Sequence, residues 1–372
     1  IQALRQAVQQ PQRTDQGRIS AMTILGRFLG EPPDAELLES LADPERAATS
    51  SLEQVLSQAA SDPSVLIDYV QGLDQQEPDV VLALVRSLRR MRDPLAVEPL
   101  RMIAQDVREE IAGAALQALG TIRLPEAARA LQTLVPISAP ALQPQAERLL
   151  RKLLFAGVEV ASLPLPEPDW RALVSPVDGL GQQSVWFIQE DRSTALARFL
   201  NVLLSDRAGA VEAAGYEQVS APGLPPRRTL GHLHDIVLAD GSGAMLMLET
   251  TFDLGRRLML EALAHNRETQ IPVAGVLRLL SPWLWSYAGA GSLAKQILPQ
   301  LGDTDALAGA SDRLVVHPAF TAWTVPAEAI QLAAEEAMRH PARDRDVWVQ
   351  RLAAEVLLDP RVAGIFSRRL VA

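Results

Sequence analysis

DVVLALVRSLRRMRDPLAVEPLRMIAQ, residues 79–105, predicts two helices joined by a short turn. Its first half carries apolar side chains at helical spacing, so a helix over residues 79–91 would present one apolar stripe. Asp93 then offers a side-chain oxygen to the free amides of a second helix, and Pro94 suits the first helical position because its missing N–H costs no hydrogen bond there. The inward-facing sets are Val81, Leu84, Val85, Leu88 and Met91 in the first helix, and Val97, Leu100 and Ile103 in the second.

This pair of helices belongs to a repeat. Four prolines stand 31 residues apart, and a large apolar residue follows each of them six places later. A period of about 20–50 residues with apolar positions in phase is typical of stacked units, none of which can bury its apolar face alone. We therefore expect an all-α solenoid over residues 1–156, with a helix beginning at each proline and no strand between residues 35 and 150. The prolines are Pro32, Pro63, Pro94 and Pro125, and the apolar residues are Leu38, Tyr69, Leu100 and Leu131.

One unit of the repeat resembles a HEAT repeat of the bacterial phycobilin-lyase-like type. The matching motifs are DP-x-AV-x-PL at Asp93–Leu100, the Asp-Val-Arg start of a helix at 106–108, AALQALG at Ala114–Gly120 and LPEAARAL at Leu124–Leu131. The neighbouring units depart from this pattern, since Asp-Val-Val at 79–81 replaces Asp-Val-Arg. The resemblance covers about residues 16–155 and implies an α-solenoid. It would also suggest tetrapyrrole handling, although such repeats occur in many unrelated proteins.

The composition is that of a globular chain, with 48% hydrophobic and 22% charged residues. The absence of cysteine excludes disulfides, thiolate metal sites and cysteine nucleophiles. No run of about 18 apolar residues could span a membrane. We therefore expect a cytoplasmic protein without a cofactor. Because the chain begins with Ile1 rather than methionine, we also expect a fragment of a longer protein.

A change in composition near residue 156 predicts a domain boundary. Val158–Pro168, VEVASLPLPEP, has three prolines and no helical period, so residues 157–168 read as a stiff connector. All six tryptophans and all five histidines follow it. We expect a second domain over residues 169–372, of the α+β class, with a small antiparallel sheet followed by helices.

The strands and helices of this second domain follow from local patterns. We expect strands at Ser184–Gln189 and at Ile236–Leu238 and Met245–Leu248 around the turn 240–243, and a hairpin of Arg198–Leu204 and Ala210–Ala214 across the turn 205–209. Thr251 or Asp253 could cap a helix that starts with LGRRLMLEALAHN, and Pro272 opens a further apolar stretch that ends at Trp285. Later helices are expected at Pro326–Arg339 and Val347–Leu358.

Two histidines are the nearest approach to a metal site. His232 and His234, two residues apart on a strand, would face one side of a sheet. Ile236, Val237 and Leu238 occupy the places where a metallo-β-lactamase-like pattern would need a further Asp and His. We therefore expect no stoichiometric metal, with His232 and His234 as weak candidates for ligands.

Two groups of side chains are candidates for a binding surface. Arg86, Arg89 and Arg90 share one face of a helix. Residues 1–155 nevertheless carry 16 Arg and Lys against 20 Asp and Glu, whereas nucleic-acid binders usually have a basic domain, so a nucleic-acid partner is not expected. The second group is aromatic, and its members Trp283, Trp285 and Tyr287 cannot all lie on one helix face. Either one of them is exposed and available to a partner, or all of them belong to ordinary core packing.

These patterns favour a non-enzymatic scaffold that binds another protein. The alternatives are an enzyme or enzyme subunit related to the phycobilin-lyase-like proteins, and a nucleic-acid-binding solenoid. We also expect the second domain to cover the apolar end of the last repeat helix, so that both halves form one rigid unit. The residues to be covered are Leu149, Leu150, Leu153, Leu154 and Phe155.

Overall fold

The computed structural model describes most of the chain between residues 55 and 289. The gaps in this range are 92, 167–168, 179–180, 192 and 238–243, and residues 1–10 and some isolated positions are described outside it. The predictions at Pro32, and almost all of those at Pro326–Arg339 and Val347–Leu358, lie outside the described residues.

The first half consists of helices. After α1 (Gln2–Gln9) come α5 (Val65–Leu73), α6 (Pro78–Met91), the 3-10 turn η1 (Pro94–Ala96), α7 (Val97–Ile103), α8 (Glu109–Leu119), α9 (Pro125–Leu134), η2 (Val135–Ile137) and α10 (Gln143–Phe155). The described residues between 55 and 156 contain no strand, as expected. Pro94 begins η1 and Pro125 begins α9, whereas Pro63 lies two residues before α5. The Asp93 side chain accepts the predicted bond from the Leu95 amide, at 2.8 Å.

These helices pack in two rows. We call α5, α7 and α9 the inner row and α6, α8 and α10 the outer row, because the members of each row contact one another in that order. Within the outer row the helices run parallel. The Arg108 guanidinium, at the start of α8, donates 2.8 Å to the carbonyl of Gln76, just before α6. In the same way, Gly113 in α8 faces Leu142, which directly precedes α10, and Gly120, which directly follows α8, faces Leu149 in α10. The partner lies 29 positions later in both cases.

The second half contains one sheet of six antiparallel strands in the order β4-β3-β2-β1-β6-β5. The expected mixed α+β class with an antiparallel sheet is therefore confirmed. The strands are β1 (Trp170–Val174), β2 (Gln182–Asp191), β3 (Leu196–Ser205), β4 (Gly209–Ser220), β5 (Leu233–Val237) and β6 (Ala244–Thr250), with η3 (Ala221–Gly223) after β4. The predicted hairpin is β3–β4, closed by Gly209 at a φ of +81°. Leu238 and the turn at 240–243 lie outside the described residues.

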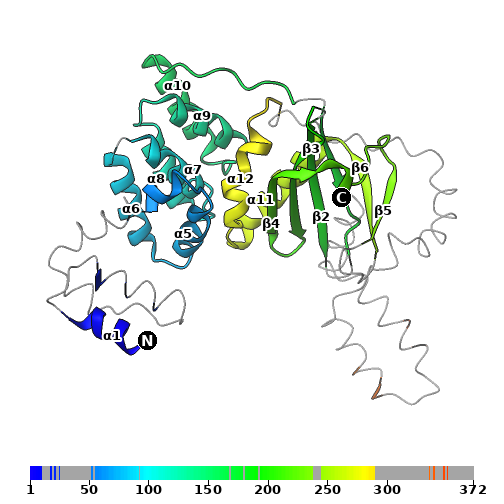
Figure 1. Ribbon diagram of the computed structural model, residues 1–372, viewed down its shortest axis with the longest axis horizontal. Coiled ribbons are helices and arrows are strands. Elements are labelled where there is room, and N and C mark those ends of the chain that lie inside the picture. Colours follow the sequence, from blue (N-terminus) through cyan, green and yellow to red (C-terminus); the bar gives the residue numbers. More distant parts are fainter. Residues whose placement is uncertain are drawn as a thin grey trace.

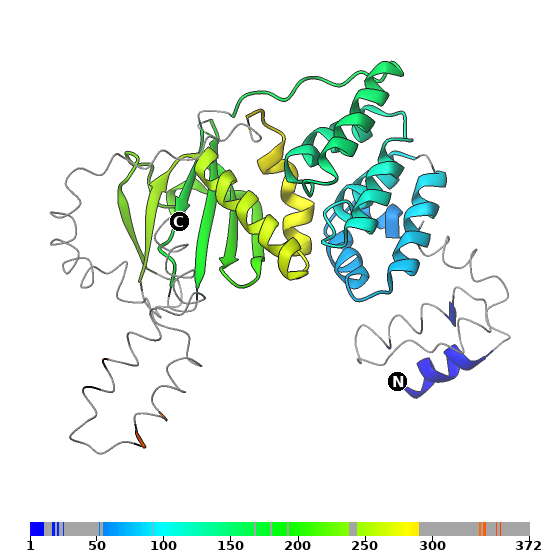
Figure 2. The ribbon, with the colours of Figure 1, turned by 180° about the vertical axis from the view of Figure 1, so that it is seen from behind.

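Two helices cover one face of the sheet, α11 (Phe252–Thr269) and α12 (Gly275–Trp285) (Figure 2). Thr251 caps α11 by accepting 3.1 Å from the Leu254 amide. From β1, Trp170, Ala172 and Val174 point toward these helices and join a core that runs without a break into the helical half. The molecule is therefore layered in the order outer row, inner row, α11 and α12, and sheet (Figure 1).

The helix α12 joins the two halves, because it packs on the sheet strand β4 and also on α5, α7 and α9. Its Arg278, 1% exposed, forms an ion pair of 2.9 Å with Asp74 at the end of α5. From α7, the buried Arg101 donates to the Arg278 carbonyl at 2.9 Å and to Ser281 Oγ at 2.6 Å. Gly275 lets the helices come close, because a Cβ there would lie 2.9 Å from Gln71 Cγ.

The expected cover over the end of α10 is wrong. Phe155 is 90% exposed and Leu154 is 43% exposed, and the main neighbours of α10 are α8, α9 and η2. The second half instead lies along the inner row, where α12 supplies a long apolar face and two buried arginines bind carbonyl oxygens. The two halves are packed together, but through the side of the helical rows.

Candidate interaction surface

The three predicted arginines lie on the outer row. Arg86, Arg89 and Arg90 are all exposed on α6, whose buried face is formed by Val81, Val85 and Leu88. The apolar stripe of this helix therefore turns the guanidinium groups away from the core. The sequence correctly placed these side chains together on one face.

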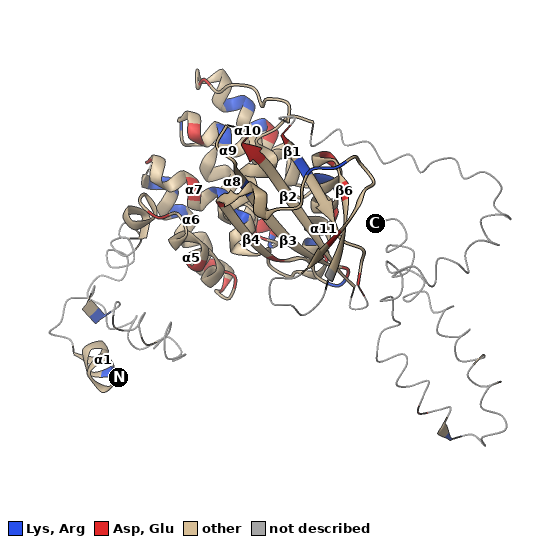
Figure 3. Ribbon diagram, turned by 45° about the vertical axis from the view of Figure 1, so that its right-hand side comes forward, with Lys and Arg blue, Asp and Glu red and all other residues tan. Residues whose placement is uncertain are grey.

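Further cations follow at the same end of the outer row. Because α6, α8 and α10 run parallel, their C-terminal ends lie on one side of the outer row, and we call the cations between the middle of these helices and that side the basic edge (Figure 3). Arg148, Arg151 and Lys152 of α10 are 62 residues, two periods of the repeat, after Arg86, Arg89 and Arg90. Arg123 follows α8 between them. The seven cations of the basic edge are Arg86, Arg89, Arg90, Arg123, Arg148, Arg151 and Lys152, all exposed.

The opposite edge of the outer row is acidic. Exposed Glu77 and Asp79 flank the start of α6, and Glu109 and Glu110 begin α8. Both distributions complement the partial charges at helix ends, which favour anions at the N-terminus and cations at the C-terminus. The row therefore carries a charge gradient from one edge to the other.

Few carboxylates neutralise the basic edge. Among the described residues, Arg151 alone of the seven cations forms an ion pair, with Glu147 at 3.6 Å. Asp93 and Glu126 lie in the turn after α6 and the first turn of α9, at the same end of the repeat units. The Asp93 carboxylate already accepts from the Leu95 amide. Glu98, in the first turn of α7, is held by Arg101, and exposed Glu159 follows α10. Apart from Glu98, the seven cations face four carboxylates, Asp93, Glu126, Glu147 and Glu159, so the edge is net positive in a chain of net charge −10.

The predicted aromatic surface is wrong for Trp285, which is 1% exposed. Trp285 faces the core because it lies on the side of α12 that carries Leu277 and Leu284. Trp283 is half-buried, and the Arg198 guanidinium lies 4.9 Å above its ring. Neither tryptophan offers an open aromatic group, so core packing is the outcome for this segment.

The two histidines do share one face of the sheet, the face opposite α11. Their rings meet edge to face at 4.9 Å. His234 is buried, and its Nε2 lies 2.8 Å from Glu249, whereas His232 is exposed. Glu249 also accepts from Arg171 at 3.0 Å, and both of these residues are 2% exposed. His234 Nε2 is therefore engaged in a buried network with Glu249 and Arg171.

No group of three metal-ligating side chains occurs in the part of the chain that the structure describes. Near His234, Arg171 binds Glu190 at 3.0 Å as well as Glu249. These carboxylates hold a buried guanidinium, which must be paired because an unpaired buried charge is costly. The arrangement serves the fold of the sheet.

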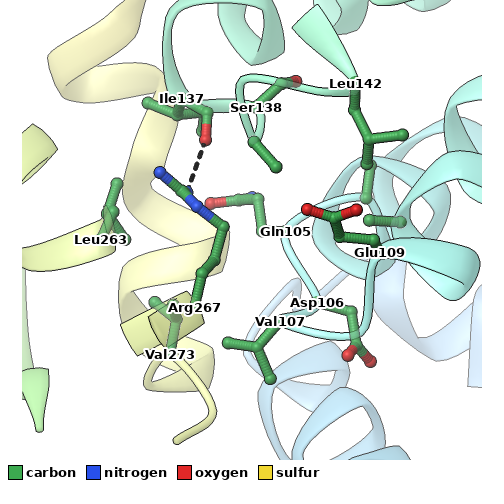
Figure 4. Close-up of a pocket in the computed structure, with 13 residues that line it drawn as sticks. Gln105, Asp106, Val107, Glu109, Ile137, Ser138, Leu142, Leu263, Arg267 and Val273 are labelled. Atoms are coloured by element: carbon green, nitrogen blue, oxygen red, sulfur yellow. Dashed lines mark hydrogen bonds between the residues drawn. The ribbon is translucent and has the colours of Figure 1, made fainter. Parts of the chain in front are cut away.

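A small cavity lies where α11 meets the helical half (Figure 4). Its volume is about 20 Å³, which suits about one water molecule. The Arg267 guanidinium crosses it and donates 3.0 Å to the Ile137 carbonyl. Burial lowers the pKa of Arg267, against the opposing effect of Glu109 and Glu268. The space is too small for a substrate.

A larger and more open hollow of about 580 Å³ lies at the β2–β3 turn. Its acidic lining comprises Asp169, Glu190, Asp191 and Glu217. The Asp191 carboxylate accepts from the Ser193 amide at 2.8 Å, from Ser193 Oγ at 2.6 Å and from Thr194 Oγ1 at 2.7 Å. These bonds lower the pKa of Asp191 to about 2, and the bond from Ser193 Oγ has the largest effect. The carboxylate oxygens of Asp191 therefore hold the β2–β3 turn together.

Comparison with protein-family models, with curated proteins and with solved structures finds no match to this chain. None of the described helices is long and apolar enough to cross a membrane.

Sequence reasoning missed Arg123, Arg148, Arg151 and Lys152 as members of the same surface. The available signal was the repeat itself, since a shift of two 31-residue periods superposes all three α6 arginines on the three α10 cations. A pattern sought within one helix could not reveal an edge that crosses several.

Proposed function

We propose that this chain is a non-enzymatic module that binds another protein through a HEAT-like solenoid. The 31-residue period and the two rows of helices support the solenoid, because stacked helix pairs produce such rows. The observation that carries the proposal is the unequal use of the rows: α12 occupies the inner row, while the outer row keeps a set of exposed, largely unneutralised cations.

A catalytic alternative has less support. The hollow at the β2–β3 turn is lined by four carboxylates and one arginine, Arg198, and this net negative charge would repel the propionate groups of a tetrapyrrole. The Arg171 network uses its carboxylates to hold a buried cation. A chromophore that copurifies with the chain would favour the enzymatic alternative.

Site-specific photo-crosslinking in the native cell tests the proposal. A photoreactive residue at Gln117, an exposed position in the middle of the outer row, should give one dominant protein adduct. The matched position is Glu217, exposed on β4 in the sheet half. Equal adducts at both positions, or none at Gln117, would overturn the outer row as the binding surface.

A further inference from the structure

We infer that the basic edge binds an extended acidic segment of a protein partner. This inference rests on the proposed function and names the chemistry of the partner. The edge presents three cations on α6, three at the equivalent positions of α10, and Arg123 between them. Gln117 of α8, and Gly120 and Thr121 just after this helix, stand at the same phase of the repeat and are uncharged, so a ligand can pass between two clusters of charge.

The dimensions of the edge suit a peptide in extended form. Neighbouring packed helices lie about 8–10 Å apart, so α6 and α10 are separated by about 16–20 Å across α8. An extended chain rises about 3.3 Å per residue, so about six residues cover this distance. Carboxylates at both ends of such a segment would reach the two clusters.

A nucleic-acid duplex fits the outer row less well, because of the acidic edge. The 14 residues of α6 correspond to about 21 Å of helix, so the two edges are about that far apart. A duplex on the basic edge has a diameter of similar size and would bring phosphates near Glu77, Asp79, Glu109 and Glu110. At physiological salt, exposed charges still interact within about 8 Å, so phosphates that come this close to the acidic edge would be repelled. A single peptide strand can remain at the basic edge.

Stabilisation of the helix ends does not account for all of these cations. The favourable effect of a cation on the helix dipole falls off within the last turn. Arg86 lies five residues before the end of α6, and Arg148 lies seven residues before the end of α10. These two residues therefore have no role at a helix end, and they extend each cluster toward the middle of the row.

Binding of a synthetic acidic peptide to the full chain tests the inference. The probe is a fluorescent peptide of about eight glutamates, measured by anisotropy at about 50 mM salt. Replacement of Arg86, Arg89 and Arg90 by Gln, or of Arg148, Arg151 and Lys152 by Gln, should each weaken binding at least about tenfold. The matched control replaces Arg207, Arg227 and Arg228 of the sheet half by Gln, with the same change of net charge, and should weaken binding less than about twofold.

Three results would overturn the inference. The first is no binding of the peptide to the unmodified chain, and the second is an equal loss in the control variant, which would show attraction to net charge alone. The third is tighter binding of a short DNA duplex that competes with the peptide, which would indicate a nucleic-acid surface. A partner that still crosslinks at Gln117 while the peptide fails to bind would leave the proposed function standing. Peptide binding without any crosslinked partner would overturn the proposed function instead.

Discussion

The inner and outer rows are built from alternate helices of the same repeat, yet the arginines at the two rows differ in burial and in pairing. In the contact with the inner row, the arginines are buried and satisfied: Arg278 binds Asp74, and Arg101 binds carbonyl oxygens of α12. On the outer row, Arg86, Arg89 and Arg90 are exposed and none of them has an ion pair among the described residues.

This difference separates a surface used for folding from one available for binding. A buried arginine whose donors are all used cannot leave without exposing an unpaired partner. An exposed arginine contributes little to stability and is free to meet a ligand. Stability should therefore respond to mutation of the arginines buried at the inner row, and binding to mutation of the arginines exposed on the outer row.

The largest effect is expected from Arg278→Ala, which leaves the Asp74 carboxylate buried without its partner. Burial already raises the pKa of Asp74, against the opposing effect of Arg278. Removing one member of a buried pair costs about 3–5 kcal/mol, so the free energy of unfolding should fall by about that amount. Arg89→Ala in the outer row is the control, with a change within about 0.5 kcal/mol in urea unfolding.

A double variant makes this test independent of the size of the side chain. Arg278→Met combined with Asp74→Leu removes both charges, and such replacements are often neutral. Recovery of most of the lost stability would show that the unpaired carboxylate causes the loss. A double variant as unstable as Arg278→Ala would contradict the ion-pair explanation.

The next effect concerns the packing between the rows. Leu119, at the end of α8, is fully buried in the repeat core. Leu119→Ala should lower the free energy of unfolding by about 2–5 kcal/mol, because it opens a cavity that neighbouring side chains cannot fill completely. Phe155→Ala is the comparison, since Phe155 is 90% exposed and should change stability by less than about 0.5 kcal/mol. Equal losses in both variants would mean that the end of α10 is covered after all.

A smaller effect is expected where α8 meets α10. A Cβ on Gly120 would lie 2.5 Å from Leu149 Cδ2 and 3.0 Å from Leu149 Cβ, so Gly120→Ala should push the helices apart at a cost of about 1–3 kcal/mol. Gly72→Ala in α5 is the matched variant, because no atom lies within 4 Å of its added Cβ. It should stabilise by about 0.4–1 kcal/mol through the unfolded chain. Thermal melts that shift in the same direction for both variants would contradict the close contact in the outer row.

The smallest effect lies outside both rows, at Asp191. Its pKa is lowered from 3.8 to about 2, so its bonds stabilise the folded state above the unfolded pKa and are lost as the pH falls toward 2. Asp191→Asn should therefore melt at a lower temperature than the unmodified chain at pH 6, and the difference should disappear near pH 2. A difference that stays constant over this range would show that the ionised carboxylate is not the cause.

Much of the local structure could be predicted from the sequence, because single residues signal it. Asp93 and Thr251 cap helices as expected, and the hairpin turn closes at Gly209. The strand β1 was missed because all five of its residues are buried, so the alternation that marks a half-exposed strand is absent. The docking of α12 could not be predicted, since Arg278 and Asp74 are 204 residues apart and neither residue identifies the other.

For the candidate surface, the sequence predicted one helix face but not the edge. Arg86, Arg89 and Arg90 are neighbours within α6, whereas their equivalents on α10 become neighbours only through the parallel packing at Gly113 and Gly120. The exposure of Trp285 was wrongly predicted because it depends on which sides of α12 are covered. One side is covered by the inner row, which is distant in the sequence.

The order of the elements along the chain has a consequence for synthesis on the ribosome. The inner row is complete at Leu134, but α12, which covers it, ends only at Trp285, about 150 residues later. At a synthesis rate of about 5–20 residues per second, its apolar side stays open for roughly 8–30 s. The central strand β1 likewise waits for β6 before both of its edges are paired. A nascent chain stalled before residue 275 should therefore recruit chaperones, and release from them should coincide with the emergence of α12.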